Sequence, residues 1–342
     1  MSADVLIAGA ILGALVLYAL TGGADFGAGT WELLASGRTR QEQRDVIEEA
    51  IAPVWEANHV WLIVVVTVLF TGFPHAFSFI TTVLHVPVLV LLLGIVLRGA
   101  AFTFRAHDPR GGAARMRWTL VFSIASLLAP LVLGTIVGAI SSGRLHMNGW
   151  VVEGGFFRPW IALWPALVGL FTLAIFSFLA AVYLCVEAND QKSAALYAFR
   201  SRAIISWGAV TVLSWVLLAF ARTEAPLIFT GLLERHWAWP LHAATAVTSL
   251  LALDGLVRGK WRRARFYAML EVVFLVGGWG ASQFPYLIVP DVTVANAAAP
   301  ERTLHLLLGA LVAGAALLFP SLLFLYRSFK GEFPFLPFER KP

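Results

Sequence analysis

The chain has 342 residues, of which 59% are hydrophobic and 13% are charged, whereas soluble domains average roughly 45–50% and 25%. So few charges cannot cover the exterior of a soluble domain of this size, and the same figures exclude a disordered or fibrous chain. The net charge is +5, but the basic residues fall between apolar runs, which indicates membrane topology and no nucleic-acid surface. The composition predicts a membrane protein.

The single cysteine, Cys185, lies inside an apolar run. One cysteine excludes an internal disulfide, a thiolate metal cluster and covalent haem attachment through a C-x-x-C-H motif. We expect Cys185 to be a small buried hydrophobic residue.

The membrane-spanning helices are predicted from stretches without Asp, Glu, Lys or Arg, because a span needs about 20 apolar residues. These stretches run 5–24, 57–97, 118–143, 159–186, 203–221, 236–253, 272–290 and 303–326. The second stretch is twice the required length and is interrupted by Gly72-Phe73-Pro74, so we expect two spans joined by a tight turn. The sequence predicts an all-α polytopic protein, a bundle of nine transmembrane helices that forms one integral membrane domain over residues 1–342.

The basic residues predict the orientation of this bundle. Of the 25 Lys and Arg residues, twenty fall on one set of alternate loops and the C-terminal tail, and five fall on the other set. Because cytoplasmic loops carry the excess of Lys and Arg, we expect the N-terminus outside and the C-terminus in the cytoplasm. The N-terminus lacks the basic region of a cleaved signal peptide, so the first span is expected in the mature protein.

Asp25 lies in the glycine-rich segment Gly22–Gly29, directly after the first apolar run. Glycines let the backbone bend and approach other groups closely. The spacing is not the dinucleotide-binding fingerprint, since no strand precedes it and no G-x-G-x-x-G is formed. Two interpretations remain open: a turn that ends the first helix with Asp25 as its cap, or a carboxylate at the mouth of a proton path.

A second polar segment begins the second predicted helix at Trp55-Glu56-Ala57-Asn58-His59-Val60-Trp61. At helical spacing, Trp55 and Asn58 share one face, and Glu56 and His59 share another. A carboxylate beside an imidazole is suited to relay protons. A single E-x-x-H also resembles half of a di-iron site, but such a site needs a second copy and two further Glu residues. We therefore predict no metal site here.

Further ionisable residues lie in or at the edge of the apolar runs: His75, His85, Glu187, His242, Asp254, Glu271 and His305. His85 and His242 are either haem ligands or histidines hydrogen-bonded to a neighbouring helix. We expect Glu187, Asp254 and Glu271 to be solvated helix ends near the inner loops.

The segments Gly23–Gly29 and Pro53–Ile63 resemble subunit II of the cytochrome bd-type quinol oxidases. The resemblance covers essentially the whole chain, continuing through Phe73-Pro74, Leu97-Arg98-Gly99, Phe102–Arg105, Phe284-Pro285-Tyr286 and Phe329-Lys330-Gly331. The chain is more similar to the second subunit than to the first, because its first span has no histidine and no long polar outer loop is present.

The resemblance implies a heterodimer with a similarly folded subunit I that oxidises quinol and reduces dioxygen to water in a bacterial cytoplasmic membrane. It implies that subunit I carries the haem groups, two haem b and one haem d, and that this chain alone binds none. Subunit II is expected to support assembly and a cytoplasmic proton path, whose carboxylates fall on Asp25 and Glu56. Family members often have Asp in place of Glu56 and Gln in place of His59, so we expect no essential role for His59.

Two other functions remain open from the sequence. The first is a proton-coupled secondary transporter that uses Asp25 and Glu56 as its coupling sites. The second is a catalytically inert assembly scaffold.

Overall fold

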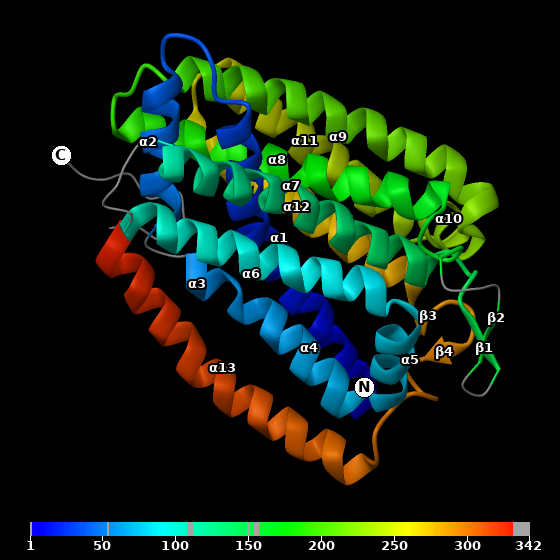
Figure 1. Ribbon diagram of the computed structural model, residues 1–342. Helices are drawn as coiled ribbons and strands as arrows, with labels where there is room; N and C mark the ends of the chain where they lie inside the picture. Colours follow the sequence, from blue (N-terminus) through cyan, green and yellow to red (C-terminus); the bar gives the residue numbers. More distant parts are fainter. Residues whose placement is uncertain (1, 53–54, 108–112, 149–150, 154–156, 331–342) are drawn as a thin grey trace.

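The computed structural model describes residues 2–52, 55–107, 113–148, 151–153 and 157–330 (Figure 1). Pro53 and Val54, at the start of the second resembling segment, lie outside these ranges, as do Gly331 and the C-terminal Pro342. Within the described part of the chain, nine helices are long and apolar enough to cross a membrane. The predicted number of spans is confirmed.

Long helices make up most of the fold. They are α1 (Ala3–Leu33), α4 (Val60–Gly72), α6 (His85–His107), α7 (Ala113–Ser141), α8 (Leu163–Asp190), α9 (Leu196–Glu224), α11 (Ala238–Val257), α12 (Trp261–Gln283) and α13 (Glu301–Lys330). The span that contains α4 begins in the four-residue helix α3 (Trp55–Asn58). Inside a bilayer a helix is favoured because it satisfies its own backbone hydrogen bonds.

Short elements connect the spans. They are the helices α2 (Arg40–Ile51), α5 (Pro74–Val83) and α10 (Pro226–Leu233), and the antiparallel hairpins of β1 (His146–Asn148) with β2 (Val151–Glu153) and of β3 (Tyr286–Ile288) with β4 (Val292–Thr293). In Figure 1, α5, α10, both hairpins and the N-terminus lie at one end of the bundle, and α2 lies at the other. The connections therefore alternate between the two ends, as the loop charges predict.

The predicted turn at Gly72-Phe73-Pro74 is only the start of a longer connection. Pro74 begins helix α5, and the next span starts at His85. Proline is well suited to the first turn of a helix, because its missing N–H has no intrahelical partner there. Helix α5 buries Ala76, Phe79 and Val83, a helical spacing that packs one face onto the bundle.

The predicted span 272–290 is also displaced, since helix α12 runs from Trp261 to Gln283. The first turns of α12 contain Arg262, Arg263 and Arg265. A span predicted from charge-free residues leaves these turns out, because they carry charge. The apolar residues after Gln283 belong to the β3–β4 hairpin.

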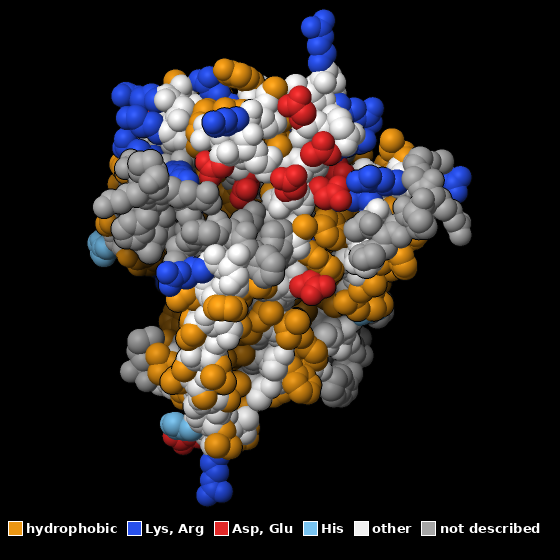
Figure 2. Space-filling view, turned by 90° about the vertical axis from the view of Figure 1, so that its left-hand side faces the viewer, with side chains coloured by type: hydrophobic (Ala, Val, Ile, Leu, Met, Phe, Trp, Pro, Cys, Tyr) orange, Lys and Arg blue, Asp and Glu red, His pale blue; other side chains and the backbone are white. Residues whose placement is uncertain are grey.

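Charged side chains gather at the end of the molecule that carries α2. Figure 2 shows Lys, Arg, Asp and Glu concentrated in its upper part, above a mostly apolar surface. Such a division between a charged end and an apolar belt is typical of a helical membrane protein.

Helices α1 and α8 pack closely at the centre of the bundle. Gly23 and Gly27 of α1 face Phe176 of α8, and a Cβ atom on Gly27 would lie 2.0 Å from the Phe176 carbonyl oxygen. The glycines of Gly22–Gly29 therefore allow close helix packing. They do not end the helix, because α1 continues unbroken to Leu33. The interpretation of Asp25 as a helix-ending cap is wrong.

Candidate functional site: a buried charged seam between α1, α6 and α7

Asp25 is buried in the middle of the bundle, with 6% of its surface exposed. Its Oδ2 accepts a hydrogen bond of 2.6 Å from the Nδ2 atom of Asn58, which joins α1 to the short helix α3. Asn58 is itself 3% exposed. A buried carboxylate needs such partners, because an isolated charge in an apolar interior is costly. The two segments singled out in the sequence, one around Asp25 and one around Glu56, therefore do meet.

Arg98 supplies the positive charge near Asp25. It lies on α6, is 1% exposed, and is within electrostatic range of Asp25 and Tyr18. The faces of its guanidinium group are covered by the rings of Phe26 and Phe122, whose centroids lie 4.9 Å and 5.1 Å from Cζ. Cation–π contacts of this kind favour a desolvated arginine.

A second buried charge pair lies two helical turns further along the same helices. Glu32 follows Asp25 by seven residues on α1, and Arg105 follows Arg98 by seven residues on α6. Nη1 of Arg105 lies 2.5 Å from Oε1 of Glu32, and the two side chains are 2% and 3% exposed. Nη2 of Arg105 lies 3.9 Å from Oε2 of Glu48 on α2. Two turns of α-helix bring residues seven apart to the same face, so both pairs lie along one seam.

Helix α7 closes this seam. The Phe122 ring lies between the two cations, with its centroid 5.1 Å from the Arg98 guanidinium and 5.0 Å from that of Arg105. Ser123 and Ser126 of α7 are also buried. A Cβ atom on Gly29 of α1 would lie 2.2 Å from the Ser126 Oγ, so the glycine lets α7 approach α1 directly.

The other residues singled out around Glu56 have different surroundings. His59 packs on the rings of Tyr18 and Phe26, at centroid distances of 6.0 Å and 5.7 Å. Trp55 packs on Phe102 at 5.7 Å. Trp61 is buried and packs on Phe319 of α13 at 5.9 Å, which links α4 to the last span.

Glu56 itself is exposed. Its backbone carbonyl accepts a hydrogen bond from the His59 N–H, but its carboxylate has no hydrogen bond or ion pair to the residues that the structure describes. Glu56 lies two residues before the buried Asn58 in the same short helix α3, and Asn58 contacts Asp25. The predicted pairing of Glu56 with His59 is not what joins this segment to α1. Asn58 makes that contact.

The two candidate haem histidines each interact with a backbone carbonyl. Nδ1 of His85 lies 2.9 Å from the Thr82 oxygen, and Nε2 of His242 lies 2.7 Å from the Leu232 oxygen. Among the described residues, no group of three His, Cys, Asp or Glu could hold a metal ion. These contacts agree with the hydrogen-bonded alternative for both histidines, and we derive no chemical step on this chain through a haem.

Glu271 of α12 is 3% exposed. The expectation that it is a solvated helix end is wrong, because α12 begins eleven residues earlier than its charge-free run suggests and carries Glu271 into the bundle. Its carboxyl group interacts with Ser249 of α11. Cys185 is buried and free, as expected.

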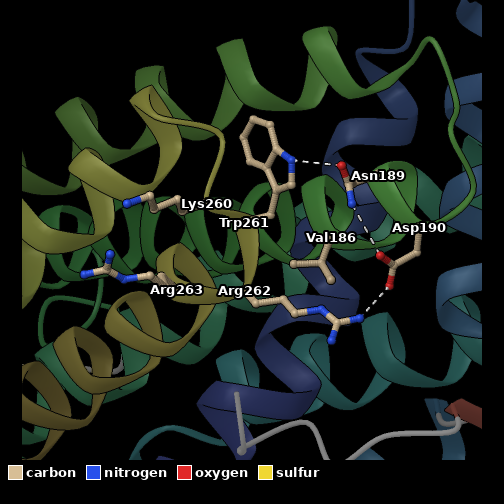
Figure 3. A pocket seen from close by; sticks show the side chains of 7 residues that line it. All are labelled: Val186, Asn189, Asp190, Lys260, Trp261, Arg262 and Arg263. Carbon is tan, nitrogen blue, oxygen red and sulfur yellow. Dashed lines mark hydrogen bonds and ion pairs between the residues drawn. The ribbon is translucent and has the colours of Figure 1, made fainter. Parts of the chain in front are cut away.

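An open pocket at the charged end lies between the end of α8 and the start of α12, away from the seam (Figure 3). There Arg262 points toward Asp190 at 3.5 Å, and Trp261 donates a hydrogen bond of 3.1 Å to Asn189, while Lys260 and Arg263 extend away from them. These contacts link the two helix ends. The pocket contains none of the residues predicted to carry function.

Sequence reasoning missed three members of the seam: Glu32, Arg98 and Arg105. The charge count treats both arginines as loop residues, because they lie at or beyond the end of an apolar run. The available signal was the spacing, since Asp25 and Glu32 on one helix and Arg98 and Arg105 on another are each seven residues apart. Removing the two buried arginines from the loop count leaves the charge asymmetry intact.

Comparison with known proteins identifies the family. A family model described as cytochrome bd terminal oxidase subunit II matches residues 3–329. The chain belongs to this family. It is 24% identical over 347 residues to a Bacillus subtilis protein provisionally assigned as a cytochrome bd menaquinol oxidase subunit II, with 97% of each chain covered. It is 30% identical to subunit 2 of the Escherichia coli K12 cytochrome bd-I ubiquinol oxidase over 129 residues, which are 38% of this chain and 33% of that one.

A solved structure shares the fold of this subunit II. The bd oxidase of Geobacillus thermodenitrificans contains a chain that matches with a TM-score of 0.80 at 21% identity, covering 96% of this chain and 99% of that one. The resemblance read from the sequence is therefore confirmed. The transporter alternative finds no support in these comparisons.

The buried ion pair of the seam leads to a stability prediction. Replacing Arg105 by Met should destabilise the assembled protein by about 3–5 kcal/mol, because Glu32 is left as an unpaired buried charge. The matched control is Arg258→Met, which breaks the exposed pair of Arg258 with Asp254 and should cost no more than about 1 kcal/mol. Thermal unfolding of the purified complex measures both.

Removing both buried charges gives a further check. Arg105→Met combined with Glu32→Leu should restore much of the lost stability, since no unpaired charge remains. Equal losses from Arg105→Met and Arg258→Met would show that the buried pair contributes nothing beyond a surface contact.

Proposed function

We propose that this subunit II pairs with a haem-carrying subunit I to oxidise quinol and reduce dioxygen to water, and that it delivers protons to the partner through Asp25 and Glu56. The relatives named above are subunits of menaquinol and ubiquinol oxidases, which supports the reaction. The observation that carries the proton role is the Asp25 carboxylate, buried between Asn58 and Arg98 inside a membrane protein.

Proton delivery requires a chain of groups that exchange protons. Reduction of dioxygen to water consumes protons as well as electrons, and an apolar interior passes protons only through titratable groups or ordered water. Asp25 is titratable and lies inside the bundle, whereas Glu56 is titratable and lies at the surface of this chain. Glu56 and Asn58, the partner of Asp25, lie two residues apart in the four-residue helix α3. This arrangement supports transfer from Asp25 toward Glu56, and from Glu56 to subunit I.

The roles of the other residues follow from their contacts. Asn58 orients the Asp25 carboxylate, and Arg98 balances its negative charge. Trp55, His59 and Trp61 pack against aromatic rings of the bundle and hold the short helix α3 in place. We further propose that two haem b groups and one haem d belong to subunit I and that this chain alone binds none.

We also propose that the complex lies in a bacterial cytoplasmic membrane among its lipids. The relatives named above are bacterial proteins, and the nine apolar helices indicate several passes through a bilayer.

Glu56 gives the direct test of the proton role. Glu56→Gln keeps the shape but cannot bind and release a proton at neutral pH, so turnover should fall at least about tenfold, or 1.4 kcal/mol of barrier. Glu56→Asp keeps the acid and should retain much more activity. Oxygen consumption of the purified complex with quinol is the measurement.

Haem absorption spectra of the same preparations serve as the control for assembly, and they should be unchanged in both variants. If Glu56→Gln turns over like the parent in a fully assembled complex, Glu56 is a structural residue of helix α3 and the proposed relay is wrong.

The charge distribution predicts the orientation in the membrane. The end that carries α2 holds most of the basic residues, so it should face the cytoplasm, with Met1 outside and Pro342 inside. Reporter fusions at the two termini, one active only in the cytoplasm and one only outside it, check this. Both termini on one side would contradict the nine-span topology.

A further inference from the structure

The pocket between the end of α8 and the start of α12 gathers positive charge at the charged end of the bundle (Figure 3). Five of the eight residues from 258 to 265 are basic and none is acidic. Lys260, Arg262 and Arg263 line the pocket, and Asp190 is the single acid among its described lining residues. The pocket has a volume of about 420 Å³, which lies in the range of ligand-binding clefts.

Most of this charge has no acidic partner within the described part of the chain. Arg262 pairs with Asp190. The basic residues around the pocket without an ion pair are Lys260, Arg263 and Arg265. In Figure 3, Lys260 and Arg263 extend to the same side, away from Asp190. The first turn of α12 contains no acidic residue that could balance them, so an anion from outside the chain would offset the repulsion between these cations.

The backbone around the pocket is held in a fixed arrangement. Helix α11 ends in a tight turn in which Gly259 has a φ of 70° and the Lys260 N–H donates a hydrogen bond of 2.7 Å to the Gly255 carbonyl. This pattern is typical of a glycine that ends a helix. Trp261 then donates a hydrogen bond to Asn189, which ties α12 to α8. The cations of the pocket therefore extend from a preformed turn.

Apolar side chains lie exposed beside these cations. Val257, the last residue of α11, is 54% exposed, and Phe266 of α12 is 37% exposed. Phe266 follows Arg263 by three residues, so the ring and the guanidinium share one face of the helix, and the ring lies farther from the charged end. Tryptophan, here Trp261, is enriched at the level of lipid headgroups. This surface fits a molecule with an anionic head and an apolar tail.

We propose that the pocket between α8 and α12 binds the headgroup of an anionic phospholipid, with its phosphate at Lys260 and Arg263 and an acyl chain along Phe266. Basic pockets between the ends of membrane helices bind anionic headgroups through such contacts. The bound lipid links the start of α12 to the end of α8 from the membrane side. The site is independent of the proton role of Asp25 and Glu56, and the outcomes below do not bear on that role.

Native mass spectrometry of the purified complex, stripped of loosely bound lipid, measures the binding. The probes are phosphatidylglycerol, which is anionic, and phosphatidylcholine with the same acyl chains, which has no net charge. We expect the parent to bind phosphatidylglycerol at least about tenfold more tightly, since each basic side chain near an anionic headgroup contributes severalfold. Equal binding of the two lipids by the parent would overturn the inference without any variant.

Variants assign the preference to the pocket. Lys260→Gln combined with Arg263→Gln should remove most of the preference for phosphatidylglycerol. The matched control is Arg38→Gln combined with Arg40→Gln, which removes two exposed charges from the same end of the molecule outside the pocket and should preserve the preference. Equal losses in the two double variants would show that the net charge of this end attracts the lipid and that the pocket is no specific site.

Asp190→Asn gives a result of the opposite sign. It removes the acid that lines the pocket and frees Arg262 for the phosphate, so phosphatidylglycerol should bind severalfold more tightly. A variant that merely disturbs the fold would not bind its ligand more tightly. Weaker binding in Asp190→Asn would contradict the proposed position of the phosphate.

Glycerol 3-phosphate distinguishes a lipid from a soluble phosphate, because it carries the same phosphate without acyl chains. In large excess it should leave phosphatidylglycerol bound to the parent, since it cannot contact Phe266 as a chain does. Displacement of the lipid by glycerol 3-phosphate would show that the pocket recognises phosphate alone, and the assignment to a phospholipid would be wrong.

Discussion

Two carboxylates on α1 must be accommodated inside an apolar helix bundle, and the arrangement of the surrounding helices follows from this constraint. Asp25 is bonded to Asn58 and lies near Arg98, while Glu32 pairs with Arg105. Because the acids and the arginines have the same seven-residue spacing, α1 and α6 run in matching register over two helical turns. Either buried charge without its partner would cost several kcal/mol, so this register is strongly specified.

Close packing of α7 and α8 against α1 allows the two carboxylates to be buried in a dense bundle. Gly27 brings α1 against the backbone of α8, and Gly29 brings it against Ser126 of α7. The carboxylates therefore sit on a rigid central helix that is held from two sides. A rigid support keeps the acid, the amide and the arginines in fixed positions, which a relay needs if each transfer is to occur over hydrogen-bond distance. The same packing leaves polar groups of Arg98 and Ser123 pointing into the seam.

The sequence predicts the nine spans because a bilayer imposes a length and an apolarity that a single chain displays directly. It does not predict helix α5, because α5 lies inside a charge-free stretch that looks the same as a span. It does not predict the true start of α12, because the arginines in the first turns of that helix lie outside any charge-free stretch. It singles out both site segments, but the contact of Asn58 with Asp25 depends on how α3 packs on α1. Arg98 looks like a loop charge until its helix is placed beside Asp25.

Proton uptake during a single turnover tests the central claim most directly. The fully reduced complex, reconstituted in vesicles, is mixed rapidly with dioxygen while a pH-sensitive dye reports the side that carries α2 and haem absorbance reports electron transfer. The account predicts that the parent takes up protons from this side as dioxygen is reduced. In Asp25→Asn, uptake should lag at least about tenfold, while the first electron transfer to dioxygen keeps its rate. Uptake with parental kinetics in an assembled Asp25→Asn complex would contradict the account.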